Sequence, residues 1–164
     1  CALFPAAGRR RLRAAAPGTG AVRDGRGQTH VVIDVVGYFT AGAGSRYFPG
    51  TPTRILDSRT HTGSPGPWAQ GQTRSVSVAS ASVAPNATGV AMNLTVTNGT
   101  AGSFLTAFPH GVPKPNASAI NFGAGQTIAN HSLLRVGRGQ LDIFNQLGTV
   151  DVVADVVGYF QMPT

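Results

Sequence analysis

The sequence contains few of the residues that several classes of function require. Cysteine occurs once, as Cys1, so neither an internal disulfide nor a paired-cysteine metal site can form. Glutamate is absent, so a glycosidase would have to draw its two carboxylates from aspartates, and the candidates among the six in the chain are Asp57, Asp142, Asp151 and Asp155. Asp151 and Asp155 share a predicted strand face but lie about 13 Å apart, beyond the usual glycosidase separation. These absences argue against glycosidase chemistry and disulfide-based folds.

Motifs of other enzyme classes are also missing. The chain has no Gly-x-Ser-x-Gly elbow, no His-Glu-x-x-His helix and no phosphate-binding Gly-x-x-x-x-Gly-Lys loop. The four histidines lie in separate segments without ligand spacing, and we interpret them as scattered surface residues: His30, His61, His110 and His131. We therefore predict no catalytic residues, no metal site and no cofactor, and we expect that the protein is not an enzyme.

Charge is scarce and uneven. Charged residues make up 12% of the chain, and the formal net charge is +7. Residues 1–39 contribute +4 of this charge, largely through the run Arg9-Arg-Arg-Leu-Arg13. A short basic run without interleaved aromatic residues is typical of non-specific phosphate contact at best, which argues against a nucleic-acid partner. No apolar run reaches the roughly 18 residues of a membrane-spanning helix, so no membrane span is predicted.

The composition and periodicity that remain predict an all-β fold. There is one lysine and no glutamate, while 22 glycines and 11 prolines interrupt the chain, which excludes long helices. From residue 74 onward apolar residues alternate; in residues 90–97, for example, every second side chain is apolar. Turn signals separate further strand candidates at 103–108, 118–122, 127–136, 140–145 and 149–160. We predict an antiparallel β-sandwich of jelly-roll type, with a barrel as the alternative.

A duplicated segment sets the domain organisation. Residues 31–39 (Val-Val-Ile-Asp-Val-Val-Gly-Tyr-Phe) return as residues 152–160 with eight of nine positions identical, 121 residues later. Such a period indicates a tandem repeat. Residues 40–164 are accordingly predicted to form one complete sandwich, and residues 1–39 to be the remnant of a preceding repeat. Within the remnant we expect residues 1–19 to be disordered or irregular and a hairpin to survive in residues 20–39.

The repeated segment is predicted to be a central strand, because both of its faces are mostly apolar. A carboxylate at Asp155 is costly to bury in such a strand unless a cation meets it. We expect a structural ion pair between Asp155 and either Arg54 or Arg59. If the arginine is buried with it, replacing Asp155 by alanine should cost about 3 kcal/mol.

Residues 40–73 lose the alternating pattern and contain several prolines, so we predict an irregular cover over the sandwich. Arg54, Asp57 and Arg59 form the sharpest polar group there: they could present hydrogen-bond donors to a sugar, a carboxylate or a phosphate, or clamp the cover to the sheet. The sole tryptophan, Trp68, is interpreted as a hydrophobic plug, with a sugar-stacking role as the alternative. Tyr47 and Phe48 would complete a stacking surface.

Several short strings in this order resemble a known family. They are Pro52-Thr-Arg-Ile-Leu-Asp-Ser-Arg59, Met92-Asn-Leu-Thr-Val-Thr-Asn98, Phe104-Leu-Thr-Ala-Phe-Pro109, Ala117-Ser-Ala-Ile-Asn-Phe122 and Asp155-Val-Val-Gly-Tyr-Phe160. Residues 47–160 are similar to the secreted cell-surface repeat domain of actinobacteria and some other soil bacteria. The resemblance implies a β-rich extracellular module, found in tandem or attached to secreted hydrolases. It implies no activity for particular residues.

Two functions follow as expectations. The first is a non-catalytic surface or interaction module, a spacer or adhesive unit that contacts neighbouring repeats of the same protein. The second is a carbohydrate-binding or cell-wall-binding module that is attached to a secreted hydrolase and takes cell-wall or other glycans. The candidate ligand-binding residues are Tyr47, Arg54, Asp57, Arg59 and Trp68.

Overall fold

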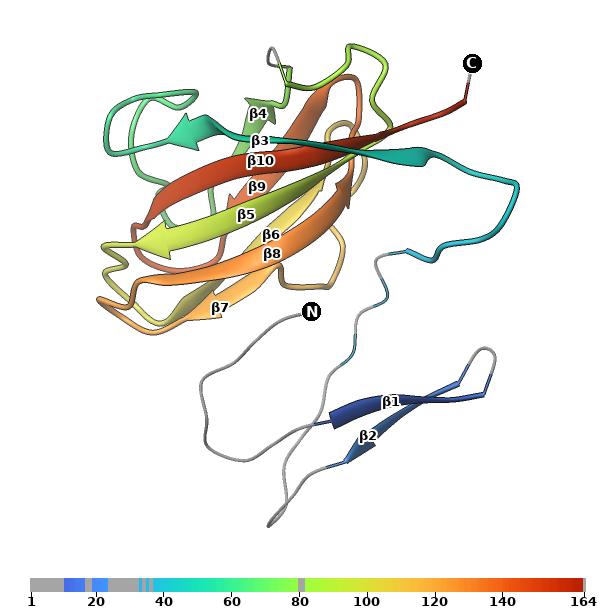
Figure 1. Cartoon of the computed structure of the whole chain (residues 1–164). Coiled ribbons are helices and arrows are strands. Elements are labelled where there is room, and N and C mark those ends of the chain that lie inside the picture. Colours follow the sequence, from blue (N-terminus) through green and yellow to red (C-terminus); the bar gives the residue numbers. More distant parts are fainter. Residues whose placement is uncertain are drawn as a thin grey trace. The chain divides into compact units, whose positions relative to one another are not determined.

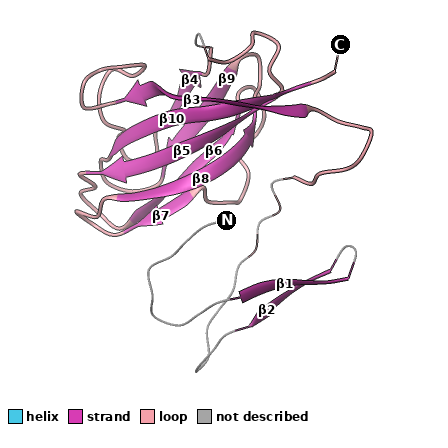
Figure 2. Cartoon of the chain, in the orientation of Figure 1, coloured by secondary structure: helices cyan, strands magenta, loops and turns pink. Residues whose placement is uncertain are grey.

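All regular structure in the described part of the chain is β-strand (Figure 2). The computed structural model describes residues 11–16, 19–23, 33, 35, 37–79 and 82–163. It divides into two compact units at Val35 and Val36. This boundary lies slightly before the one predicted at residues 39 and 40.

The first unit contains one described hairpin. Strand β1 (Arg11–Ala16) pairs antiparallel with β2 (Thr19–Arg23). Residues 11–16 were expected to lack regular structure, and this expectation is wrong. The sequence places Pro17-Gly18, a dipeptide typical of turns, between the two strands. The described hairpin thus spans residues 11–23 and overlaps the predicted range only at residues 20–23. The rest of the predicted hairpin falls largely on residues 24–32, 34 and 36, which lie outside the described part, as do residues 1–10 and 17–18.

The second unit is a sandwich of two four-stranded antiparallel sheets (Figure 1). The first sheet has the order β3 (Arg46–Asp57), β10 (Asp151–Gln161), β5 (Gly89–Thr97) and β8 (Ile128–Arg135). The second has the order β4 (Thr73–Ser77), β9 (Gln140–Asn145), β6 (Ser103–Pro109) and β7 (Ile120–Phe122). The predicted sandwich is confirmed, and the barrel alternative is wrong. Within this unit the chain crosses between the sheets, and its first and last strands, β3 and β10, pair with each other, as in a jelly roll.

Alternation along the strands builds the core between the sheets. In β5 the side chains of Val90, Met92, Leu94 and Val96 are fully buried, as their period of two predicts. Side chains from the second sheet complete the core, and these are Val76, Leu105, Ile120, Phe122, Leu141 and Ile143.

Strand β10 is central, lying between β3 and β5 as its apolar sequence predicts. Its register with both neighbours shifts between Val156 and Gly158, which marks a bulge at Val157. Simple alternation would place Phe160 on the core face with Val156. The bulge reverses the faces, so that Tyr159 packs against the core and Phe160 lies beside Tyr47.

The first part of the predicted irregular cover is in fact the long strand β3, so the expectation for residues 46–57 is wrong. The prolines that hid it are tolerated because β3 is the edge strand of its sheet and needs no partner on its outer side. Pro49 lies opposite Gly158 in the register. Residues 58–72, which follow, do form a cover without long strands, crossed only by short bridges such as that between Trp68 and Val150.

Candidate functional site

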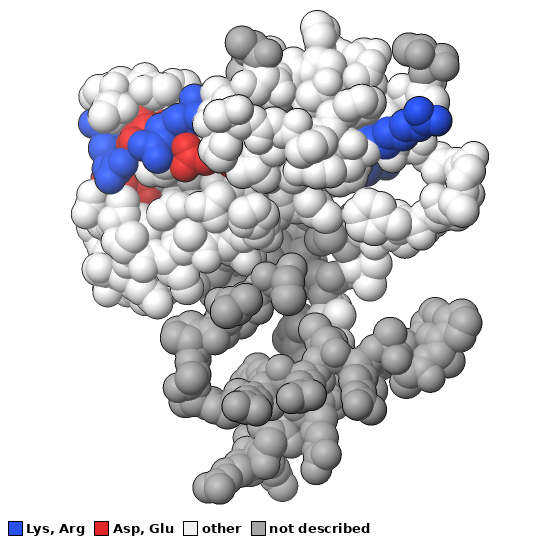
Figure 3. Space-filling model, viewed as in Figure 1, with Lys and Arg blue, Asp and Glu red and all other residues white. Residues whose placement is uncertain are grey.

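The predicted polar residues gather where β3 ends. We call Arg54, Asp57, Arg59 and Asp155 the Arg54 cluster. In Figure 3 charged side chains of both signs gather at the end of the molecule to which β3 runs. Arg54 lies directly opposite Asp155 in the β3–β10 register. An extra residue in β3, Ile55, separates Arg54 from the buried Leu56 and lets the two side chains take opposite faces.

Asp57 is the buried centre of the Arg54 cluster. Arg59 donates Nε to Oδ1 at 2.9 Å and Nη2 to Oδ2 at 2.7 Å, and its backbone N–H also reaches Oδ1 at 3.2 Å. Arg54 Nη1 donates to Oδ2 at 3.2 Å. The hydrogen bonds from Arg59 outweigh the effect of burial and, with the two positive charges, lower the pKa of Asp57 to about 2. Asp57 is therefore ionised at neutral pH and holds both guanidinium groups.

Asp155 pairs with Arg54 and not with Arg59. Arg54 Nε lies 2.9 Å from Oδ1 of Asp155, and Nη2 lies 3.2 Å from Oδ2, which is a bidentate arrangement. The pair is more open to water than the sequence predicted, since 24% of the Asp155 side chain and 48% of the Arg54 side chain are exposed. The expected loss of about 3 kcal/mol on removal of Asp155 is corrected accordingly, because water screens a half-exposed pair.

The Arg54 guanidinium is engaged within the cluster. Nε, Nη1 and Nη2 of Arg54 all donate to the two carboxylates. Two guanidinium groups face two carboxylates, so the cluster carries no excess positive charge to attract an anion. Its geometry fits a clamp that fastens the end of β3 to β10.

A second tie lies next to the clamp. Ser58 donates to Asp151 Oδ1 at 2.6 Å, and Asn98 donates to Oδ2 of the same carboxylate at 2.9 Å. The Ser58 hydroxyl oxygen also accepts the backbone N–H of Val152 at 2.9 Å. The backbone N–H of Ser58 also donates to the Val152 carbonyl oxygen at 3.1 Å, so Ser58 fastens the turn after β3 to the start of β10 through three hydrogen bonds.

Trp68 is a plug and not a stacking platform. Its side chain is fully buried, its Nε1 donates to the Ile143 carbonyl oxygen at 2.8 Å, and its backbone pairs with Val150. The Arg74 guanidinium lies 4.9 Å from the centre of the Trp68 ring and donates to the carbonyl oxygen of Gly66. The stacking role for Trp68 is thus wrong, because a buried ring offers no face to a sugar.

Tyr47 and Phe48 are exposed by 43% and 39% but point to opposite faces of the strand, as neighbouring residues must. Tyr47 lies 5.1 Å from Phe160 between ring centres with a tilt of 46°, whereas Phe48 stacks on Tyr159 at 5.2 Å and 15°. They cannot form one flat surface together. The aromatic group on the outer face is instead Tyr47, Phe160 and Phe39, whose ring centre lies 6.3 Å from that of Phe160.

The second sheet carries a polar group that sequence spacing did not find. We call Ser75, His110 and Asp142 the Asp142 cluster. Ser75 Oγ donates to Asp142 Oδ1 at 2.7 Å, and His110 Nδ1 lies 2.9 Å from the same oxygen. Burial would raise the pKa of Asp142, but the hydrogen bonds from Ser75 and His110 and the charge of His110 lower it overall.

The Asp142 cluster contains the residue types of a serine hydrolase in a different arrangement. In a catalytic relay the histidine uses one nitrogen for the aspartate and the other for the serine. Here Nδ1 faces both Asp142 and Ser75, at 2.9 and 3.2 Å, and the serine hydroxyl is already bonded to the carboxylate. The only sequence signal was cross-strand: Ser75 opposes Asp142 in the β4–β9 register, which depends on the strand pairing.

The described residues contain no group of three histidine, cysteine, aspartate or glutamate side chains placed to hold a metal ion. Within that same part of the chain, no helix has the length and apolarity to cross a membrane. No protein-family model matches the chain, and none of the curated proteins compared with it is similar in sequence.

Proposed function

We propose that the chain belongs to a non-catalytic extracellular module, a spacer or adhesive unit of a repeat-containing secreted protein. The observation that carries this proposal is the duplicated segment. Its second copy, residues 152–160, lies in a central strand of a complete sandwich, and six residues separate the end of its first copy from β3. Tandem sandwiches joined by short linkers suit a role in spacing or in multivalent contact. The extracellular location rests on the resemblance of residues 47–160 to secreted cell-surface repeats.

The use of the carboxylates supports a non-catalytic role. All four aspartates within residues 36–164 accept hydrogen bonds from neighbouring side chains, and these are Asp57, Asp142, Asp151 and Asp155. A general acid or base needs a group that can reach a substrate proton. Carboxylates held by intramolecular donors serve the fold instead.

A second candidate function is binding to cell-wall or other glycans. The group formed by the exposed Tyr47 and Phe39 and the half-buried Phe160 on one face favours it, because aromatic rings stack on the apolar faces of sugars. The three rings are tilted toward one another, which fits a curved ligand better than a flat chain. Trp68 has no part in this candidate site.

One experiment separates these functions. The purified chain is incubated with insoluble peptidoglycan, chitin and cellulose, and both sedimentation of the protein and release of soluble sugar are measured. A spacer stays in solution, and an adhesive unit sediments in a way that is unaffected by Tyr47→Ala. Glycan binding predicts that Tyr47→Ala weakens sedimentation at least about tenfold, the loss expected for one buried stacking contact.

Leu147→Ala is the matched control, since Leu147 is equally exposed but lies away from the aromatic group. Release of soluble sugar above the level of a heat-denatured sample would overturn the non-catalytic proposal.

A further inference from the structure

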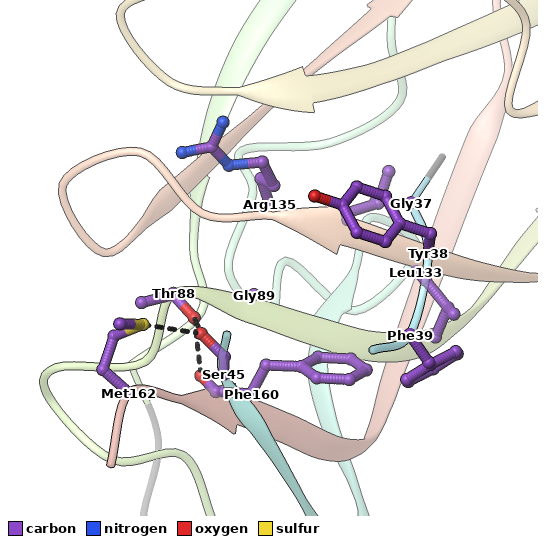
Figure 4. A pocket seen from close by; sticks show the side chains of 11 residues that line it. Gly37, Tyr38, Phe39, Ser45, Thr88, Gly89, Leu133, Arg135, Phe160 and Met162 are labelled. Carbon is purple, nitrogen blue, oxygen red and sulfur yellow. Dashed lines mark hydrogen bonds between the residues drawn. The ribbon is translucent and has the colours of Figure 1, made fainter. Parts of the chain in front are cut away.

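A cleft opens beside the end of β10. It has a volume of about 360 Å³, and we call it the terminal cleft. Its walls come from the segment before the linker, from Ser45, from the start of β5 and from the ends of β8 and β10. The lining residues are Gly37, Tyr38, Phe39, Ser45, Thr88, Gly89, Leu133, Leu134, Arg135, Phe160 and Met162. In Figure 4 the Phe160 ring extends toward Phe39, while the Arg135 side chain points away from them. The lining is therefore mainly apolar.

The apolar walls of the terminal cleft are exposed to solvent. The exposed fractions are 88% for Tyr38, 81% for Phe39 and 55% for Met162, and Leu133 is also exposed. Single exposed apolar residues are common on protein surfaces, but a contiguous group of this kind marks an interaction site.

The repeat identifies the two sides of the terminal cleft. Gly37-Tyr38-Phe39 is the copy of Gly158-Tyr159-Phe160, so Phe39 and Phe160 occupy equivalent positions in successive repeats. Their ring centres lie 6.3 Å apart. The segment that corresponds to the end of the last strand in the preceding repeat thus lies beside the end of β10.

The linker limits where the preceding repeat can lie. Residues 40–45 separate Phe39 from β3, and six residues span at most about 20 Å. The far end of the linker is fixed, because Ser45 Oγ lies 2.6 Å from Thr88 Oγ1 and donates to Met162 Sδ at 3.4 Å. A complete preceding repeat is accordingly held within about 20 Å of the exposed walls, at a local concentration near the millimolar range.

We propose that the terminal cleft is the joint between successive repeats and that its occupant is the preceding sandwich, whose chain leaves it through Gly37-Tyr38-Phe39 in the cleft wall. The Gly-Tyr-Phe end of each repeat lies beside the equivalent phenylalanine of the next, and the sandwich to which it belongs covers the walls around Leu133 and Met162. The array then has a fixed angle at each joint. This inference rests on the proposed function as a repeat module, and it adds a specific partner surface.

The test duplicates residues 40–160 in place within the full chain. Because Phe160 of the first copy is then followed by Thr40 of the second, the sequence Gly-Tyr-Phe-Thr of the natural junction is kept. Nuclear magnetic resonance relaxation is measured on the linker of the duplicated chain. A fixed joint predicts backbone order parameters of about 0.85 for residues 40–45 between the copies, and values below about 0.6 would overturn it.

Variants locate the contact. Phe160→Ala in the second copy should lower the linker order parameters below about 0.6, while Leu147→Ala in the same copy should leave them unchanged. Amide spectra of β5 and β9 show whether each variant remains folded. If Phe160→Ala leaves a rigid linker, the terminal cleft is not the joint. A mobile linker in a chain that releases no sugar would refute the proposed joint and leave the proposed function standing. Release of sugar from cell walls would refute the proposed function.

Discussion

The Asp57 carboxylate provides the sharpest test of the clamp. Replacing Asp57 by asparagine keeps the shape of the side chain but removes its charge. The new amide group turns a donor toward Arg59 or Arg54, where the carboxylate accepted four hydrogen bonds. Because the side chain is buried, the lost acceptor is not replaced by water, and the free energy of unfolding should fall.

The pKa of Asp57 sets the expected size of this loss. A decrease from 3.8 to about 2 corresponds to about 2 kcal/mol of stabilisation at pH 7. The folded-state pKa lies below the unfolded value, so this stabilisation is complete above about pH 5 and is lost as the pH falls toward 2. It should decrease to about 1 kcal/mol at pH 3 and to a few tenths at pH 2.

The assay is urea denaturation of the wild-type chain and of Asp57→Asn at pH 7, 5, 4 and 3. We expect a difference of about 2 to 3 kcal/mol at pH 7, which is a melting shift of about 8 to 12 °C for a sandwich of this size. The difference should shrink by about half at pH 3.

Asp151→Asn is the control, since its carboxylate is bonded to the neutral donors Ser58 and Asn98, and it should cost about 1 kcal/mol. A difference that is absent at pH 7, or that stays constant down to pH 3, would refute the clamp.

Four further substitutions test the remaining contacts. Asp155→Ala should lower the free energy of unfolding by about 1 kcal/mol, as expected for a half-exposed ion pair, and a loss of 3 kcal/mol in urea denaturation would contradict the screening argument. Gly158→Ala should cost about 1 to 3 kcal/mol, because the new methyl group would overlap the Tyr47 ring and lie 2.7 Å from the Phe48 carbonyl oxygen; an unchanged melting temperature would show that the bulge can relax. Trp68→Ala should cost about 3 to 5 kcal/mol in the same assay, and a loss below 1 kcal/mol would argue against the plug. Ser75→Ala should raise the pKa of Asp142 in a carbon-13 titration, and no upward shift would mean that the Ser75 hydrogen bond contributes little.

Local patterns in the sequence were sufficient for the all-β class, the core of β5 and the central position of β10. Alternation with a period of two depends only on the geometry of a strand, and a strand that is apolar on both faces must lie between neighbours. The duplicated segment likewise predicts a repeat unit of 121 residues. The strand β3 escaped detection because its prolines read as breaks, and only the edge position in the sheet makes them acceptable.

The sites depended on tertiary structure to a much greater degree. Sequence chemistry identified Arg54, Asp57 and Arg59 as one group and Asp155 as a carboxylate in need of a cation. The choice between the two arginines required the β3–β10 register, which the bulge at Ile55 sets. The Asp142 cluster joins residues from β4, β9 and the turn that follows β6, and no local spacing brings them together. A strand pattern specifies which face a side chain takes, whereas only the pairing of distant strands decides which side chains meet across it.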